Sequence, residues 1–223
     1  MLKKIVISAR NKIISVISPS VQEKRKRYLK KIRKKLKNSN PTIIASNCNG
    51  TIIMHDLGLR FNTPFINLWI APKDYIRLVQ NFDEYMNAEL IEVKCSNYDY
   101  PIGLLKDIHV FFQHYQSFEE AKNKWEERKT RINKDNIFVL FTDRDGCTLD
   151  NLLEFEKLDY PFKIVFVHKP YKNISSAFYI KGFEDMDFVG ICSEFMPKKA
   201  WLRYIDQFNY VKWLNSGIKK LRA

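Results

Sequence analysis

A polar turn early in the chain carries the residues best suited to chemistry. It reads Ser46-Asn47-Cys48-Asn49-Gly50-Thr51, and His55-Asp56 lies close behind it. Residues 42–45 before the turn are apolar and predict a short buried strand, and the segment after it predicts a helix ended by Gly58. Ligands of open α/β sheets collect where strands end, because the free N–H groups at a helix start attract anions. The turn is therefore a candidate ligand site.

Cys48 is the candidate nucleophile of this turn. We expect the dipole of the following helix to stabilise its thiolate and so to lower its pKa. The catalytic base is then His55, about two helical turns further on, or His114 or His168 from elsewhere in the chain. Substrate contacts are expected from Asn47, Asn49 and Gly50. The alternative is a plain tight turn in which Cys48 is a small buried residue.

A second candidate, Gln113-His114-Tyr115, follows a predicted strand. We expect His114 to act as general base and Tyr115 to contact the substrate; the alternative is a histidine bonded to the loop backbone. Asn67, at the predicted strand 64–70, would orient the substrate.

A third candidate lies on a predicted charged helix, where Arg128 and Arg131 can clamp a phosphate or carboxylate. In the alternative, they pair with Glu126 and Glu127 on a solvated face.

The fourth candidate, Thr142-Asp143-Arg144-Asp145-Gly146, follows the most apolar predicted strand. Carboxylates at Asp143 and Asp145 can bind Mg²⁺ or Mn²⁺ together with a phosphorylated sugar nucleotide. The run is similar to the opening Asp-x-Asp-Gly-Thr motif of haloacid-dehalogenase-type phosphatases, although Cys147 breaks that register before Thr148. A divalent metal is therefore a candidate cofactor, and an ordinary Asp-Gly turn is the alternative.

These stretches need a sheet to bring them together. The hydrophobic patterns predict strands at 42–45, 64–70, 90–93, 102–105, 108–112, 136–142 and 163–167. They predict helices ending at 57, opening at 72, and spanning 117–132 and 149–158, with an aromatic-rich helix over 201–214. Alternating strands and helices indicate a three-layer α/β/α fold with a mixed, largely parallel sheet, in which the hairpin near 102–112 supplies the antiparallel part. Residues 39–223 are expected to form this single domain.

The excess positive charge is confined to residues 1–38. They contain 14 Lys or Arg and one acid, which accounts for the whole net charge of +13; the remainder balances 24 basic against 24 acidic residues. A neutral body argues against a nucleic-acid-binding face.

The basic arm is predicted to be helical in two parts separated by Pro19. The first part, Leu2 to Ile17, has an apolar stripe beside lysines and arginines, and the second has Tyr28, Leu29, Ile32 and Leu36 on one side. Lysine-rich amphipathic helices suit an anionic membrane surface. The alternative is an arm that packs on its own domain or on a partner.

The cysteines are widely spaced, at positions 48, 95, 147 and 192, which argues against a zinc site of closely spaced ligands. Neither a signal-peptide pattern nor an apolar run long enough to span a bilayer is present. We therefore expect free thiols and a cytoplasmic protein, peripheral at the inner face of the membrane.

In their order along the chain, several of these segments resemble a bacterial family, domain of unknown function 1919. The matching segments lie within residues 41–170 and begin at Ser46, His55, Asn62, Tyr100, Phe112, Trp125 and Thr142. Thr51 departs from the pattern, where a second glycine is expected. The basic arm lies outside the matching segments.

Members of that family are often labelled exopolysaccharide or capsular polysaccharide biosynthesis proteins. The resemblance implies an α/β/α fold and a role in polysaccharide assembly, and it implies no reaction. We expect a protein that modifies or transfers a glycan or sugar-phosphate intermediate, as a transferase or hydrolase. The alternative is a non-catalytic scaffold that recruits polysaccharide assembly enzymes.

Overall fold

The computed structural model describes residues 19–220, so the first predicted arm helix, Leu2 to Ile17, lies outside the described residues. The helices are α2 (Pro19–Arg33), α3 (Asn49–Leu57), α4 (Pro72–Gln80), α5 (Phe82–Asn87), α6 (Phe118–Lys129), α7 (Leu149–Glu156) and α8 (Tyr210–Lys220), with 3₁₀ turns η1 (Lys134–Asn136) and η2 (Tyr204–Gln207). The strands are β1 (Thr42–Ala45), β2 (Leu90–Val93), β3 (Ile102–Leu105), β4 (Ile108–Phe111), β5 (Ile137–Thr142), β6 (Lys163–Val167), β7 (Ala177–Tyr179), β8 (Phe195–Met196) and β9 (Lys199–Arg203).

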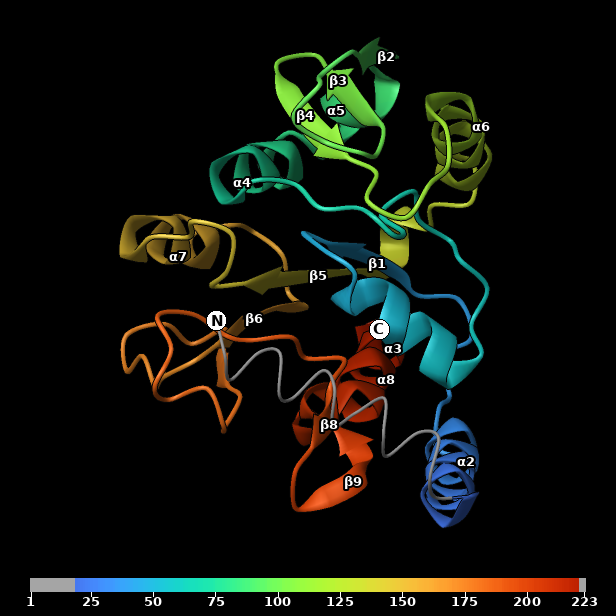
Figure 1. Ribbon diagram of the computed structural model, residues 1–223, viewed down its shortest axis with the longest axis vertical. Helices are drawn as coiled ribbons and strands as arrows, with labels where there is room; N and C mark the ends of the chain where they lie inside the picture. Colours follow the sequence, from blue (N-terminus) through green and yellow to red (C-terminus); the bar gives the residue numbers. More distant parts are fainter. Residues whose placement is uncertain (1–18, 221–223) are drawn as a thin grey trace.

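The centre of the fold is a parallel sheet in the order β1-β5-β6-β7. Side chains of β5 alternate between its two faces, so Val139 and Phe141 enter one core while Phe138 and Leu140 enter the other. Helices α4 and α7 cover the first face, and α3 and α8 cover the second (Figure 1). The predicted α/β class and its three layers are confirmed.

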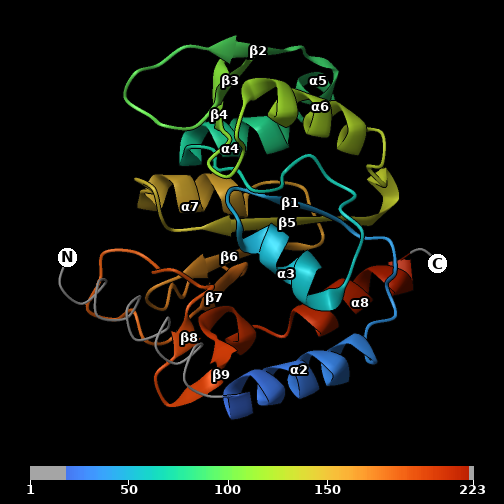
Figure 2. The same ribbon diagram turned by 45° about the vertical axis from the view of Figure 1, so that its right-hand side comes forward.

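The antiparallel strands form a separate sheet in the order β2-β3-β4, instead of extending the parallel one. This small sheet lies beyond α4, at the top of the molecule in Figures 1 and 2. The predicted hairpin is present, but it leaves the central sheet wholly parallel. The reason is packing: Leu105, Ile108 and Val110 bury their side chains in the core that α4 also fills.

The prediction of a strand at residues 64–70 is wrong. This segment is irregular, and only Trp69 pairs with a strand, through two backbone hydrogen bonds of 2.9 and 3.0 Å with Phe111. Asn67 has a φ of 58°, which interrupts an extended chain. The predicted helix over 201–214 is also wrong at its start, because Trp201 lies in the β8–β9 ribbon and the helix begins at Tyr210.

Two glycines explain the geometry of α3. Gly58 has a φ of 69° and ends the helix in the left-handed conformation, as predicted. A Cβ at Gly50 would lie 2.7 Å from the Cβ of Ala45, so glycine allows α3 to start directly against β1.

The second part of the basic arm, α2, packs on the body through a buried ion network. Arg25 is 7 % exposed; its Nη2 lies 2.5 Å from Asp56 Oδ2, and its Nη1 contacts Asp206. Arg203 Nη1 reaches the same Asp56 oxygen at 3.3 Å. Two further basic side chains of α2 contact the body: Arg33 Nε donates to Asp56 O at 2.7 Å, and Lys24 lies over the Trp201 ring. Lys26, Arg27, Lys30 and Lys31 are exposed. Among residues 19–220, no helix has the length and the apolar composition that crossing a bilayer requires.

Replacing Arg25 by methionine should lower the free energy of unfolding by about 3 kcal/mol, because it leaves buried carboxylates without their main partner. Arg27→Met is the matched control on the same helix, since the Arg27 side chain is 78 % exposed and pairs only with Glu23. It should change stability by less than about 0.5 kcal/mol. Urea unfolding followed by circular dichroism measures both, and equal effects would contradict the structural role of Arg25.

Candidate functional site

A cavity of about 560 Å³ opens at the carboxyl ends of β1 and β5, and we call it the β1–β5 cavity. Four parts of the chain line it: the turn after β1, the aromatic and polar residues around β4, the turn after β5, and a loop near the C-terminal ribbon. The lining residues are Asn47, Cys48, Asn49, Ile52, Trp69, Tyr100, Gln113, His114, Arg144, Asp145, Ile191, Cys192 and Ser193.

The two turns meet because β1 and β5 are parallel neighbours in register, with Ala45 opposite Leu140. Beyond that register, Ser46 N donates to Leu140 O at 3.1 Å, and Asn47 Nδ2 donates to Thr142 Oγ1 at 2.8 Å. Asn47 Oδ1 in turn accepts from the N–H of Asn49 at 3.2 Å. The Asn47 amide is therefore occupied in joining the two strand ends.

Asp143 and Asp145 lie in different environments. Asp143 is buried: its Oδ2 accepts from His168 N at 2.9 Å and lies 2.6 Å from His168 Nδ1, while its Oδ1 accepts from Val189 N at 2.6 Å. Asp145, with a φ of 59°, lines the cavity. The described part of the chain contains no group of three or more His, Cys, Asp or Glu side chains arranged to hold a metal ion.

Cys48 is a protonated thiol in this site, contrary to the expected activation. Burial raises the pKa of the Cys48 thiol to about 11, and the charge of Arg144 opposes this rise. Its Sγ points toward Leu68 O at 3.9 Å. The prediction of a lowered pKa was wrong because removal of the sulfur from water outweighs the partial charge of a helix terminus. All four cysteines are unpaired, as expected.

An aromatic wall bounds the cavity on the side of the small sheet. The Trp69 ring stacks on Phe111 with centroids 3.9 Å apart and planes 6° apart. Its indole N–H donates to Tyr100 Oη at 3.3 Å. This arrangement holds a flat, half-buried indole at the cavity, where the ring of a ligand can pack on it.

Three features of the cavity favour an anionic ligand. The residue Asn49 is 7 % exposed, and the hydrogen bonds among residues 19–220 include none made by its side-chain amide, which is therefore available to a ligand. Asn49 is also the first residue of α3, where the helix dipole attracts negative charge. The Arg144 guanidinium adds a positive charge to the same lining.

Six predicted site residues lie outside the cavity lining, namely Asp143, Tyr115 and Arg128 together with Gly50, Asn67 and His55. Gly50 packs against β1 as described above. Asn67 donates its backbone N–H to Thr51 Oγ1 at 3.1 Å. His55 lies in the last turn of α3 with its side chain 75 % exposed, beside Asp56 and away from Cys48.

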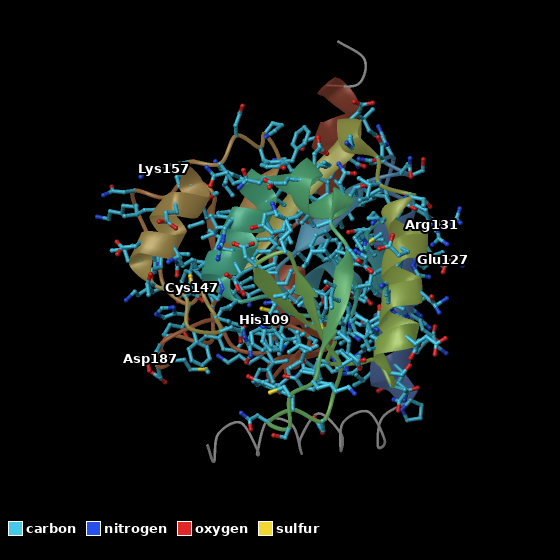
Figure 3. All side chains as sticks on the ribbon, turned by 90° about the horizontal axis from the view of Figure 1, so that it is seen from above. His109, Glu127, Arg131, Cys147, Lys157 and Asp187 are labelled. Carbon is cyan, nitrogen blue, oxygen red and sulfur yellow. The ribbon has the colours of Figure 1, made fainter. Side chains whose placement is uncertain are left out.

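Tyr115 and Arg128 also serve the fold in this structure. The buried Tyr115 hydroxyl donates to Ile66 O at 3.0 Å and accepts from Arg128 Nη1 at 2.6 Å. Burial raises the pKa of Tyr115, and the neighbouring Arg128 counteracts that rise. Arg131, which follows α6, pairs with Glu127 of that helix (Figure 3). Its Nη1 also donates to Phe61 O at 3.4 Å and its side chain is 21 % exposed, so the pairing expected in the alternative is present but the face is not fully solvated.

Sequence reasoning missed the aromatic wall and the loop 191–193. Tyr100 carries a signal that could have identified it, since this aromatic residue lies between Asp99 and Pro101, whereas Trp69 lies between Leu68 and Ile70 and resembles an ordinary core residue. The loop 191–193 has no comparable signal, because only the tertiary fold carries it to the ends of β1 and β5.

The buried thiol of Cys48 predicts slow alkylation at neutral pH. Iodoacetamide should modify the exposed Cys95 first and leave Cys48 largely intact at pH 7. The rate at Cys48 should then rise about tenfold per pH unit toward its pKa, because only the thiolate reacts. Peptide mass spectrometry measures each site separately. Modification of Cys48 at pH 7 as fast as that of Cys95 would show an activated thiolate instead.

The chain is similar in sequence to one curated protein and to one protein-family model. An uncharacterized protein of Haemophilus influenzae (strain ATCC 51907 / DSM 11121 / KW20 / Rd) is 42 % identical over 200 residues, covering 88 % of this chain and 95 % of that protein. The model of a family described as domain of unknown function (DUF1919) matches residues 20–215. The match is wider than residues 41–170 and includes α2, so the placement of the whole basic arm outside the resemblance is corrected. The chain belongs to the DUF1919 family.

Proposed function

We propose that this protein binds a phosphorylated glycan intermediate in the β1–β5 cavity and serves exopolysaccharide or capsular polysaccharide biosynthesis. One observation carries the proposal: the Asn49 side-chain amide, the Arg144 cation and a flat aromatic wall share a single cavity. The role in polysaccharide assembly is what the resemblance of the sequence motifs implies. The cavity supplies the chemistry that such a ligand requires.

The phosphate group is assigned to the first turn of α3. There the helix dipole, the Asn49 amide and the Arg144 guanidinium can all act on the same anion. Arg144 forms a long ion pair, in which its Nε lies 3.9 Å from Asp145 Oδ1, and its guanidinium lies 5.9 Å from the centre of the Phe188 ring. A bound phosphate would offer the guanidinium a closer anion than Asp145.

The sugar ring is assigned to Trp69. One face of a pyranose ring presents C–H groups that pack on an indole, while its hydroxyls point outward and need polar partners. Gln113, His114 and Asp145 provide such partners around the same lining. An apolar ligand would leave these groups without hydrogen bonds.

If the protein catalyses transfer or hydrolysis, His114 and Asp145 are the cavity groups suited to move a proton. His114 is exposed at the cavity, and we propose it as the general base. Cys48 enters as a neutral thiol, so we assign it to binding and not to nucleophilic attack.

The cavity argues against the alternative function as a non-catalytic scaffold. A non-catalytic scaffold would be favoured by a turn at 46–56 sealed from solvent. Instead, Asn47, Cys48 and Asn49 line an open cavity, which supports ligand binding.

Calorimetric titration with hexose, hexosamine and hexuronic acid 1-phosphates and their neutral parent sugars tests the assignment. Arg144→Gln should lower the affinity for the phosphorylated ligands about tenfold or more, because it removes a charge-assisted contact. Trp69→Ala should lower the affinity for phosphorylated and neutral ligands alike. Arg60→Gln is the matched control, since Arg60 is exposed and lies outside the cavity lining. If the protein bound no member of the panel, the proposal would be wrong.

We also propose that the outer face of α2 holds the protein at an anionic membrane surface. Helix α2 carries one acidic residue, Glu23, against a dense set of basic side chains. Lys26 and Lys30 of α2, and Lys34 directly after it, are exposed and have no ion pair within residues 19–220. Each cation close to such a surface contributes on the order of 1 kcal/mol.

Charge reversal of Lys26, Lys30 and Lys34 to Glu should therefore abolish sedimentation of the full chain with phosphatidylglycerol vesicles. Reversal of three exposed lysines of the body, Lys73, Lys157 and Lys172, changes the net charge equally and should largely retain binding. Neither protein should bind phosphatidylcholine vesicles. Equal losses in both triple variants would show an effect of net charge alone and contradict a role for this face.

A further inference from the structure

A row of aromatic rings continues outward from the β1–β5 cavity. Trp69 and Tyr100 line the cavity. Beyond them, Tyr98 lies 5.2 Å from Tyr100 and 5.3 Å from Phe111 between ring centroids. His109 extends the row, with its ring 6.3 Å from that of Phe111.

Strand register explains why this row faces outward. Phe111 lies opposite Ile102, and His109 lies opposite Leu104, so these side chains share one face of the small sheet. The other face is packed: a Cβ at Gly103 would lie 2.6 Å from a methyl carbon of Leu90. His109 is labelled on this sheet in Figure 3, which views the molecule from above.

The loop between β2 and β3 carries Tyr98, and Figure 2 shows this loop projecting from the small sheet. Tyr98 is 40 % exposed although its ring contacts those of Tyr100 and Phe111, so part of this aromatic residue is accessible to a ligand.

We infer that the ligand is an oligosaccharide chain, with one sugar in the cavity and the following sugars on this aromatic row. The inference rests on the proposed function and deepens it. The Tyr98 ring lies 5.2 Å from that of Tyr100, which lines the cavity, and this separation is comparable with the length of one sugar unit in a polymer. The row is continuous with the cavity, because Trp69 and Tyr100 belong to both.

The polar residues beside the row favour a glycan over an acyl chain or an apolar protein surface. Ser96, Asn97 and Asp99 are exposed in the Tyr98 loop, and His109 is exposed on β4. Sugar hydroxyls can satisfy these groups while the ring faces pack on the aromatic side chains. An apolar partner would bury the same groups without hydrogen bonds.

The experiment measures affinity against chain length. The full protein is titrated with hexose, N-acetylhexosamine and hexuronic acid oligomers, from single sugars to hexasaccharides, each with a 1-phosphate. Wild-type affinity should rise with length, by roughly three- to tenfold for each ring that a sugar covers. Tyr98→Ala should remove one such step for the longer chains and leave single sugars unchanged. Tyr98→Phe keeps the ring and should keep the gain.

The outcomes separate the two proposals. Single sugar phosphates that bind, with no gain for longer chains or with Tyr98→Ala identical to wild type at every length, would overturn the inference and leave the proposed function intact. Failure of every member of the panel to bind would overturn both. Circular dichroism of Tyr98→Ala checks that the exposed substitution leaves the fold unchanged.

Discussion

One buried carboxylate holds the carboxyl end of the sheet together. Asp143 follows β5 and accepts hydrogen bonds from the backbone of His168, just after β6, and from Val189, which precedes the loop 191–193 of the cavity wall. A carboxylate at 4 % exposure is stable only when such donors surround it. The cavity therefore has its shape because Asp143 is satisfied within the protein. The two aspartates of the Asp-x-Asp pair have different roles. Asp143 is buried and stabilises the fold, whereas Asp145, which has a positive φ, lines the cavity.

The regular elements were predictable wherever burial follows a simple period. Strand β5 has a continuous apolar run because both of its faces are covered, and Ser117 marks the start of α6 by accepting from Glu120 N at 3.1 Å. The segment 64–70 was misread for a physical reason. Its apolar residues Phe65, Ile66 and Leu68 are buried in the core although their backbone is irregular. An apolar run alone does not reveal whether its backbone pairs with a strand.

The sequence could predict which turns form the site, but it could not predict which side chains of those turns enter the cavity. Parallel neighbouring strands bring their carboxyl ends together, so the turns at 46–49 and 144–145 could be expected to meet. Which side chain of a turn enters the cavity depends on local geometry: Asn49 lines it, while the next residue, Gly50, lies against β1. The pKa of Cys48 depends on burial, which is a property of the tertiary structure and has no counterpart in residue spacing.

Helix α3 connects the two halves of the proposed function. Its first residue, Asn49, lines the cavity, and its last turn binds α2 through Asp56, whose side chain pairs with Arg25 and whose carbonyl accepts from Arg33 Nε at 2.7 Å. A short helix with buried contacts at both ends is rigid, so α2 and the cavity keep a defined relative orientation. Arg25 directs its charge inward to make that connection, and the other cations of α2 remain at the surface. Residues 39–223 carry no net charge, so in the proposed arrangement an anionic surface would attract mainly the basic arm, and α3 would fix the orientation of the β1–β5 cavity relative to that surface.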